Sequence, residues 1–304
     1  MPSIRTRSLE MFYEDGGPPH GSPILLIHGW PDTARGWKPV AQYLQSKGYR
    51  TIAPYLRGTL PTRFLSETTP RFAGGVALAQ DAIDLADALK LSRFAVVGHD
   101  WGARAAYILS ALFPERLTAI ATLALAYQPR GVFSVPSDLR QSMRFWYQWF
   151  QCIDDGVDAI RKDPVGFARL QWETWSPPGW YSDAEFEATT QSFSHPDWIA
   201  TTLNGYRLRW LQDEPRDPFF DDLQSRLGGI ERLSTPALMI QGASDFCDGP
   251  EESAGQEAYF TNGYRRLLLD GIGHFVHREA PQKVAEAIAK HLADQIIEDS
   301  SGAP

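Results

Sequence analysis

The sequence predicts an α/β fold with a mostly parallel central sheet flanked by helices. Three observations support this. Short apolar runs at residues 23–27, 93–97 and 236–240 have the composition of strands that are buried on both faces. Amphipathic helical patterns alternate with such strands, which is typical of parallel sheets. The chain has 304 residues, of which 43% are hydrophobic, so it is long enough for one such domain with an insertion.

The first predicted element is an edge strand or hairpin at residues 8–15, because apolar and polar residues alternate loosely there. A Gly-Gly-Pro-Pro turn follows it and leads into the central strand at 23–27. The elements expected beyond this point are a helix at 37–47, a strand at 51–55, a helix at 76–90, a strand at 93–97, a strand at 117–127, a strand at 236–240, a strand at 265–269 and a final helix at 283–297. Residues 299–304 are expected to be disordered.

The character of the sequence changes between residues 135 and 230. Strand signals vanish, helical stretches take over, and seven of the ten tryptophans fall in this segment. We therefore expect a helical cap at 135–230, inserted into an α/β core formed by residues 1–134 and 231–304. Because the cap connects two strands of the sheet, it should lie over the carboxyl edge of the sheet. A cavity between cap and core would be dry and aromatic, which suits an apolar substrate.

The segment 96–104 predicts a strand, a tight turn and a helix, with Asp100 at the tip of the turn. Gly98 and Gly102 lie two residues to either side, where they allow the chain to reverse sharply and the helix to pack closely. The free amides at the start of the helix favour an anion. A carboxylate has a reference pKa of about 4, so at pH 7 it is ionised and can attack a saturated carbon. This pattern indicates a nucleophilic Asp100 that forms an ester with its substrate.

Hydrolysis of such an ester requires a general base for water and an acid that orients the base. Two later strands end in suitable residues, the first in Asp245 and the second in His274. The order nucleophile, acid, histidine is the order of α/β hydrolases, and predicts that fold. The strand at 117–127 ends without an acid, so Asp245 is the expected orienting carboxylate, with Asp248 as its main rival.

The His-Gly-Trp-Pro segment at residues 28–31 follows a central strand, so it should face the turn at Asp100. We expect the backbone amides of Trp30 and Trp101 to form an oxyanion hole when water attacks the ester. A cis bond between Trp30 and Pro31 would help to aim the Trp30 amide. The residues expected to line the substrate pocket are His28, Pro31, Trp149 and Phe275.

The composition excludes several classes of partner. A net charge of −8 and an isoelectric point near 5.4 argue against nucleic acid or an anionic membrane surface. No apolar run approaches the roughly 20 residues that cross a bilayer, the amino terminus lacks a secretory signal, and only two cysteines occur. We therefore expect a cytoplasmic monomer or homodimer. Its partners should be water and a small apolar substrate that is uncharged or weakly charged.

The sequence contains no metal-ligand spacing and predicts no cofactor. His277 follows His274 by three residues, and we expect it to be a solvent-exposed or loop residue.

The His-Gly-Trp-Pro segment, the Gly-His-Asp-Trp-Gly segment at 98–102 and the helical cap resemble the α/β-hydrolase-fold epoxide hydrolases. The resemblance covers most of the chain. It implies that two cap tyrosines hydrogen-bond the epoxide oxygen as the ring opens to a vicinal diol. Tyr147, in a Tyr-Gln pair, and Tyr206, in an Asn-x-Tyr-Arg segment, match these positions. One departure occurs at 55–60, where Tyr-Leu-Arg-Gly-Thr-Leu replaces the family's usual Asp-x-Arg-Gly-Tyr-Gly.

Two alternatives remain open. A haloalkane or haloacetate dehalogenase would use the same aspartate, histidine and acid, with the indole N–H groups of Trp101 and Trp149 holding the halide. Haloacetate dehalogenases, however, pair their cap tryptophan with a histidine, where this chain has Gln148. A non-catalytic receptor for a small ligand on the same scaffold is the second alternative, although it would tolerate a broken triad and this triad is complete.

Overall fold

The computed structural model describes the backbone of residues 1–301 and the side chains of residues 1–295. Within this part of the chain, nine strands form one sheet in the order β1-β2-β4-β3-β6-β7-β8-β9, with β5 beside β2. All pairs from β4 to β9 are parallel, while β1, β5 and β4 pair antiparallel with β2. The strands are β1 (Ser3–Arg5), β2 (Leu9–Gly16), β3 (Pro23–Ile27), β4 (Arg50–Pro54), β5 (Arg63–Phe64), β6 (Phe94–His99), β7 (Leu117–Leu123), β8 (Ala237–Gly242) and β9 (Tyr264–Leu269).

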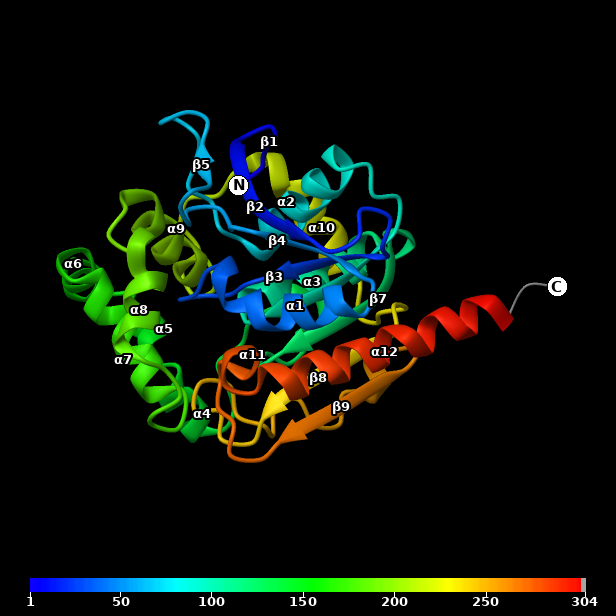
Figure 1. The fold of residues 1–304 in the computed structure, drawn as a ribbon. Helices are drawn as coiled ribbons and strands as arrows, with labels where there is room; N and C mark the ends of the chain where they lie inside the picture. Colours follow the sequence, from blue (N-terminus) through cyan, green and yellow to red (C-terminus); the bar gives the residue numbers. More distant parts are fainter. Residues whose placement is uncertain (302–304) are drawn as a thin grey trace.

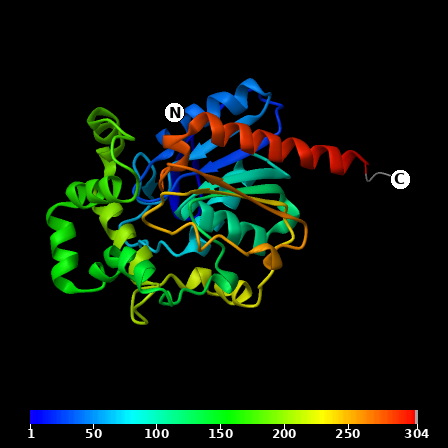
Figure 2. The same ribbon diagram turned by 90° about the horizontal axis from the view of Figure 1, so that it is seen from below.

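Helices cover both faces of this sheet, as the two views in Figures 1 and 2 show. Helices α1 and α12 pack together on one face, and α2 and α10 pack beside α3 on the other. Their bounds are α1 (Lys38–Ser46), α2 (Gly75–Ala88), α3 (Trp101–Leu112), α10 (Asp221–Gly228) and α12 (Pro281–Ser301), with the short α11 (Val276–Glu279) before α12. The predicted α/β fold with a mostly parallel sheet is therefore confirmed.

The remaining helices lie between β7 and β8 in the sequence. They are α4 (Leu139–Arg144), α5 (Trp146–Phe150), α6 (Asp154–Lys162), α7 (Pro164–Thr174), α8 (Asp183–Thr189) and α9 (Pro196–Arg207). Figure 1 shows α4 to α9 beside the carboxyl ends of the parallel strands, whereas α10 packs on α3. Short 3-10 helices connect many of the elements: η1 (Ala34–Trp37), η2 (Pro114–Arg116), η3 (Pro129–Gly131), η4 (Thr190–Ser192), η5 (Pro218–Phe220) and η6 (Glu257–Tyr259).

β2 forms a hairpin with β1, which is one of the two forms expected for residues 8–15. Two details differ from the sequence-based expectations. β7 ends at Leu123, before the predicted residue 127, because Ala124 turns the chain with a φ of 69°. Residues 299–301, which were expected to be disordered, continue α12, while 302–304 lie outside the described residues.

Among the helices of the described chain, none has both the length and the apolar character needed to span a membrane.

Candidate active site

The turn between β6 and α3 holds Asp100 in an uncommon backbone conformation, with φ 51° and ψ −114°. Such a conformation is strained for a residue with a side chain, and strain of this kind clusters at functional sites. The flanking glycines are required by close backbone contacts. A Cβ on Gly98 would lie 2.1 Å from the Gly102 carbonyl oxygen, and one on Gly102 would lie 2.0 Å from that of Ile27. The sequence therefore brings α3 close to the sheet and presents Asp100 at the strand end.

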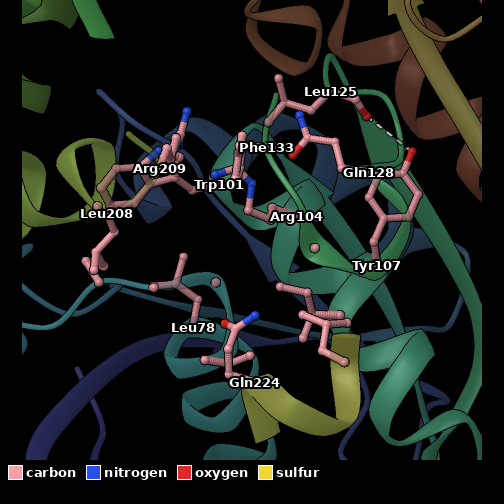
Figure 3. A pocket seen from close by; sticks show the side chains of 18 of the residues that line it. Leu78, Trp101, Arg104, Tyr107, Leu125, Gln128, Phe133, Leu208, Arg209 and Gln224 are labelled. Carbon is pink, nitrogen blue, oxygen red and sulfur yellow. Dashed lines mark hydrogen bonds between the residues drawn. The ribbon is translucent and has the colours of Figure 1, made fainter. Parts of the chain in front are cut away.

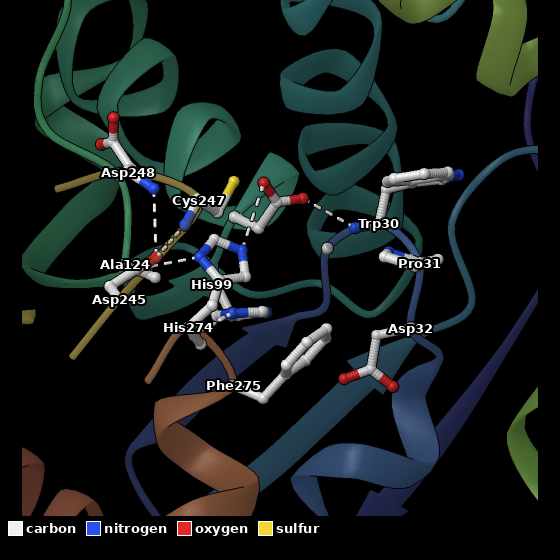
Figure 4. Close-up of polar contacts among 12 residues, drawn as sticks. Trp30, Pro31, Asp32, His99, Ala124, Asp245, Cys247, Asp248, His274 and Phe275 are labelled. Atoms are coloured by element: carbon white, nitrogen blue, oxygen red, sulfur yellow. Dashed lines mark hydrogen bonds and ion pairs between the residues drawn. The ribbon is translucent and has the colours of Figure 1, made fainter. Parts of the chain in front are cut away.

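Two backbone amides point at the Asp100 carboxylate. The Trp30 amide donates to Oδ1 at 2.7 Å (Figure 4). The Trp30–Pro31 peptide bond is cis, as expected. Burial raises the pKa of Asp100, whereas the nearby His274 and the backbone amides of Trp30 and Trp101 act in the opposite direction. The Trp30 amide therefore binds one carboxylate oxygen, and the other, Oδ2, faces His274.

His274 lies between two carboxylates. Its Nδ1 is 2.9 Å from Oδ2 of Asp245, and its Nε2 is 3.8 Å from Oδ2 of Asp100 (Figure 4). Burial alone would lower the pKa of His274, but the charge and hydrogen bond of Asp245 raise it above its ordinary value. Within the described residues, Nε2 has no hydrogen-bond partner. This nitrogen is therefore available to take a proton from a water placed beside Asp100.

Asp245 is held by several donors, whereas the rival Asp248 serves elsewhere. The amides of Cys247 and Asp248 donate to Oδ1 of Asp245 at 2.8 and 3.0 Å. The Asp248 carboxylate instead accepts from the Ala126 amide at 3.2 Å. Burial and the charge of Asp245 raise the pKa of Asp248 to about 8, so at neutral pH this carboxyl group is mostly protonated. Of the two acids, Asp245 is the one hydrogen-bonded to the histidine.

Tyr147 on α5 and Tyr206 on α9 meet above the strand ends. Both are buried, and their ring centroids are 5.3 Å apart at an interplanar angle of 84°. Both rings also contact Trp30, at centroid distances of 6.1 and 5.1 Å. Burial raises the pKa of both phenols well above the usual value, which keeps them protonated. In the described part of the chain, the Tyr206 hydroxyl has no hydrogen-bond partner.

This site can be compared with those of known proteins. The family model for the alpha/beta hydrolase fold matches residues 22–281. Epoxide hydrolase 3 of Siraitia grosvenorii is 34% identical over 307 residues, which cover 93% of this chain and 94% of the relative. The chain belongs to the α/β-hydrolase-fold epoxide hydrolase family. An epoxide hydrolase of Caballeronia sordidicola is 28% identical over 312 residues, covering 95% of this chain and 92% of the relative.

Solved structures of the family agree with this assignment. The crystal structure of a candidate epoxide hydrolase from Klebsiella pneumoniae is similar with a TM-score of 0.89 and 33% identity, covering 96% of this chain and 97% of that one. Epoxide hydrolase A of Mycobacterium thermoresistibile has a TM-score of 0.79 at 24% identity, covering 96% and 97% of the two chains. At that identity, the second likeness shows the common fold alone.

Two of the expected pocket residues are used elsewhere in the structure. His28 Nε2 accepts from the Leu56 amide at 3.1 Å, and its Nδ1 contacts the Gly29 carbonyl at 2.9 Å. Nε2 of this buried ring therefore connects the end of β3 to the loop after β4, while Nδ1 contacts the neighbouring residue, so neither nitrogen is free to bind a substrate. The Trp149 indole donates to the Ser142 carbonyl at 3.1 Å and packs on Trp210. Its indole N–H is therefore already engaged, which disfavours the halide-donor role of the dehalogenase alternative.

The other two expected pocket residues, Phe275 and Pro31, lie close to the site and contact the residues around it. Phe275 packs on the His274 ring at a centroid distance of 5.4 Å and stacks on Trp180 at 4.6 Å. The Pro31 carbonyl accepts a hydrogen bond from the Trp172 indole at 2.9 Å. Both contacts join the strand ends to the helical segment.

Sequence reasoning missed Trp175, at the end of α7. Its ring contacts those of Tyr147 and His274 at centroid distances of 4.8 and 4.9 Å, and its carbonyl accepts from the His274 amide at 3.3 Å. The concentration of tryptophans between residues 135 and 230 was a signal for an aromatic wall. Spacing alone, however, did not distinguish Trp175 from Trp149, because their contacts depend on how separate helices pack.

A second histidine cluster lies beneath the nucleophile. His277 was expected to be a solvent-exposed or loop residue, but it is buried on α11. Its Nε2 lies 3.1 Å from Oδ2 of Asp32, and its ring packs on that of His99 at a centroid distance of 4.4 Å. Asp32, His99 and His277 have ligand atoms close enough together to hold a metal ion. Arg278, however, donates to both oxygens of Asp32. A cation would compete with this guanidinium, so the donor set suits a hydrogen-bonded network better than a metal centre.

Proposed function

We propose that this protein opens an apolar epoxide to a vicinal diol through a covalent ester on Asp100. Residues 135–230 would act as a cap over the core formed by 1–134 and 231–304. The observation that carries the proposal is the meeting of a buried carboxylate with two protonated phenols, those of Tyr147 and Tyr206. A carboxylate can attack the ring carbon, and phenols can give a proton to the departing oxygen. No cofactor or metal enters this scheme.

In the first step, Oδ2 of Asp100 attacks one ring carbon. The carbon–oxygen bond of the epoxide breaks as the new ester bond forms, and the released alkoxide takes a proton from a phenol. The oxygen assignment follows from the site, since Oδ1 accepts from the Trp30 amide while Oδ2 faces the free Nε2 of His274. Oδ1 then becomes the carbonyl oxygen of the ester.

In the second step, water adds to the ester carbonyl carbon as Nε2 of His274 takes its proton. Negative charge develops on Oδ1, which already accepts from the Trp30 amide, and the Trp101 amide also favours charge on this carboxylate, so both amides would stabilise the tetrahedral intermediate. Asp245 would hold the ring and stabilise the imidazolium that forms. Collapse of the intermediate breaks the bond to the substrate oxygen, which takes the proton from the His274 imidazolium and leaves as the hydroxyl of the diol. The proton of the regenerated Asp100 carboxyl group returns through solvent to the phenolate left by the first step, so the carboxylate and both phenols are restored.

The dehalogenase alternative is weakened by the position of Trp149. A halide site of the expected kind needs two indole N–H donors, and the Trp149 indole is bound to the Ser142 carbonyl. An alkoxide also needs a proton, which a phenol can supply, whereas a halide is a weak base and needs only a dipole. The paired tyrosines therefore favour the epoxide.

A comparative assay tests this function. Wild-type protein is incubated with styrene oxide, 1-chlorobutane and fluoroacetate, and release of diol and halide is followed. We expect diol from the epoxide and little halide, with turnover unchanged after dialysis against a chelator. Asp100→Ala should retain less than about a thousandth of the activity, because no other group can form the ester. Release of halide without any diol would refute the epoxide proposal.

Isotope labelling tests the covalent step separately. In a single turnover in ¹⁸O-water, the label should enter Asp100 and the diol should carry unlabelled oxygen from the carboxylate. Label found only in the diol would instead mean direct attack by water.

A further inference from the structure

A cavity of about 210 Å³ lies beside Trp101, and neither Asp100 nor His274 lines it. Figure 3 shows Arg104, Arg209, Trp101 and Phe133 grouped at one side of this cavity. Most of the remaining lining is apolar, with Phe72, Leu78, Ile108, Leu125, Leu208 and Leu227 among its residues. Three arginines contribute to the lining, and none of the lining residues in the described chain is an aspartate or glutamate.

The two inner arginines gather around one aromatic ring. The guanidinium carbon of Arg104 lies 4.0 Å from the Phe133 ring centroid, and that of Arg209 lies 4.7 Å from the same centroid. Arg209 also covers the ring of Tyr206, at 4.3 Å. Stacking on aromatic faces holds a guanidinium in place without neutralising its charge.

Neither inner arginine forms an ion pair with the side chains that the structure describes. Arg209 donates to the neutral carboxamide of Gln148, at 3.1 Å. Burial and the charge of Arg209 lower the pKa of Arg104 to about 9, although the charge of Asp100 acts in the opposite direction. The third arginine, Arg216, is exposed at the cavity and also has no ion-pair partner among the described side chains. Positive charge is therefore concentrated here without an internal anion, which is a costly arrangement for buried groups.

Two unused hydrogen-bond donors at this cavity indicate the same kind of ligand. Nε of Arg209 and Nε1 of Trp101 are buried, and within the described residues neither has an acceptor. Buried donors are rarely left without a partner. Arginine and tryptophan side chains can only donate, so a ligand here has to offer acceptors, and the nearby charge favours an anion.

The shape and lining of the cavity restrict the kind of anion. Apolar side chains form a large part of the cavity walls, so a phosphate, which brings four oxygens into this small space, would place some of them against hydrocarbon. A carboxylate has two oxygens that match the planar guanidinium, and an attached hydrocarbon chain would fill the apolar part. We propose that this cavity binds the carboxylate of an apolar acid, with Arg104 and Arg209 as its ligands.

Two residues link this cavity to the reacting carboxylate. Trp101 and Gly205 both line the cavity. In the sequence, Trp101 directly follows Asp100, and Gly205 directly precedes Tyr206. The Trp101 and Tyr206 rings are in contact, at a centroid distance of 5.4 Å. The carboxylate that binds here then has one of two sources. It is the distal end of an epoxide substrate that reaches past these rings, or it belongs to a separate acid. Only the first source rests on the proposed epoxide hydrolase activity.

Calorimetric titration with hexanoate and its neutral isostere hexanamide tests the binding. Wild-type protein should bind hexanoate at least tenfold more tightly than hexanamide, because only the acid satisfies the guanidinium groups. Arg104→Met should lose most of this difference, and Arg104→Lys should recover part of it. Arg232→Met removes an exposed arginine elsewhere on the protein and serves as the control for charge, so its binding should be unchanged.

Three results would overturn the carboxylate site. These are equal affinity of the wild type for acid and amide, full hexanoate binding by Arg104→Met, and tighter binding of inorganic phosphate than of hexanoate. The first and third comparisons use only the wild type, so they hold even if the Arg104 variants fail to fold.

Kinetics with 5,6-epoxyhexanoate and its methyl ester distinguish the two sources. If the cavity holds the distal end of the substrate, the acid should have at least a tenfold lower KM than the ester in the wild type, and this advantage should vanish in Arg104→Met. A separate acid would leave the two KM values equal, while hexanoate still binds. Absence of turnover with every epoxide would refute the proposed function, yet the titration would still decide whether the cavity binds carboxylates.

Discussion

Nε2 of Gln148 donates a hydrogen bond to the phenol oxygen of Tyr147 at 3.1 Å. The carboxamide oxygen of Gln148 accepts from Arg209 and from the Trp210 indole, at 3.1 and 3.2 Å, which fixes the orientation of the amide. Because the phenol oxygen accepts this bond, its own proton remains available to another acceptor. Gln148 therefore acts as a positioning residue for the proposed proton donor.

The first prediction concerns this contact. Gln148→Leu should slow ester formation from an epoxide by about tenfold, because the phenol loses the bond that aims its proton. Ester hydrolysis, which depends on His274, should proceed at the original rate. Rapid-mixing measurements of the two steps in single turnovers would separate them. The matched control is Gln151→Leu, since the Gln151 side chain is also fully buried and its amide donates to the main-chain oxygen of Tyr147, not to the phenol. If Gln148→Leu slowed ester formation and ester hydrolysis equally, the effect would be a general structural one instead.

The second prediction concerns the two phenols themselves. Tyr147→Phe or Tyr206→Phe alone should lower the rate of ester formation by roughly 10²-fold or less, because one donor remains, and the double variant should lose more. The aromatic ring is retained in each case, so packing changes little. Tyr264→Phe, whose hydroxyl instead donates to the Ser253 carbonyl, provides the control. A double variant that opens epoxides at the wild-type rate would remove the tyrosines from the mechanism.

The parts of the site that depend on local sequence could be predicted. Gly98 and Gly102 are needed wherever a helix crosses so close to a strand end, and the order of Asp100, Asp245 and His274 follows from the order of parallel strands. Strand identity was equally accessible, because apolar runs of five residues reflect burial on both faces. These features require only neighbours within a few positions of one another or the topology of the sheet.

Features that depend on packing between distant segments could not be predicted. Trp149 and Trp175 both lie in the aromatic-rich insertion, but only the path of α5 and α7 decides which indole reaches His274. His277 resembled a loop residue because its buried partner, Asp32, lies 245 positions away in the sequence. Nothing in the residues beside His277 indicates this contact. The cavity at Arg104 could not be predicted either. The net charge of −8 suggested a substrate with little charge and gave no sign of a local excess of arginine.

The third prediction separates the two chemical steps. His274→Gln should still form the ester, because attack on a saturated carbon needs only the ionised Asp100, but it should not hydrolyse it. Intact-mass spectrometry after exposure to styrene oxide would then show an increase of one substrate mass. The adduct should be absent when Asp100→Ala is combined with His274→Gln, which assigns it to that carboxylate. An unmodified His274→Gln protein would contradict this division of labour.

The fourth prediction concerns the stability of the network beneath the nucleophile. Asp32 is buried, which would raise its pKa, but Arg278 and His277 lower the pKa of Asp32 well below its usual range. A carboxyl group whose folded pKa is lowered adds stability above its unfolded pKa of about 4, and that stability is lost as the pH falls toward the folded value. Asp32→Asn removes this contribution and leaves the buried Arg278 with Glu185 as its remaining carboxylate partner among the described side chains.

We therefore expect Asp32→Asn to lower the free energy of unfolding by about 3–5 kcal/mol at pH 7, as when one partner of a buried ion pair is removed. The matched control is Asp87→Asn, because Asp87 is 58% exposed and pairs with Arg116 at the surface. Asp87→Asn should lower the free energy of unfolding by less than about 1 kcal/mol. Urea unfolding at pH 7 and at pH 4 measures the free energy of unfolding of both variants and of the wild type. Near pH 4, Asp32 takes up a proton in the unfolded chain while it stays ionised in the folded protein, so the free energy of unfolding of the wild type falls. The difference in free energy of unfolding between wild type and Asp32→Asn should therefore narrow at pH 4. A difference that widens there would contradict the assigned direction of the pKa shift.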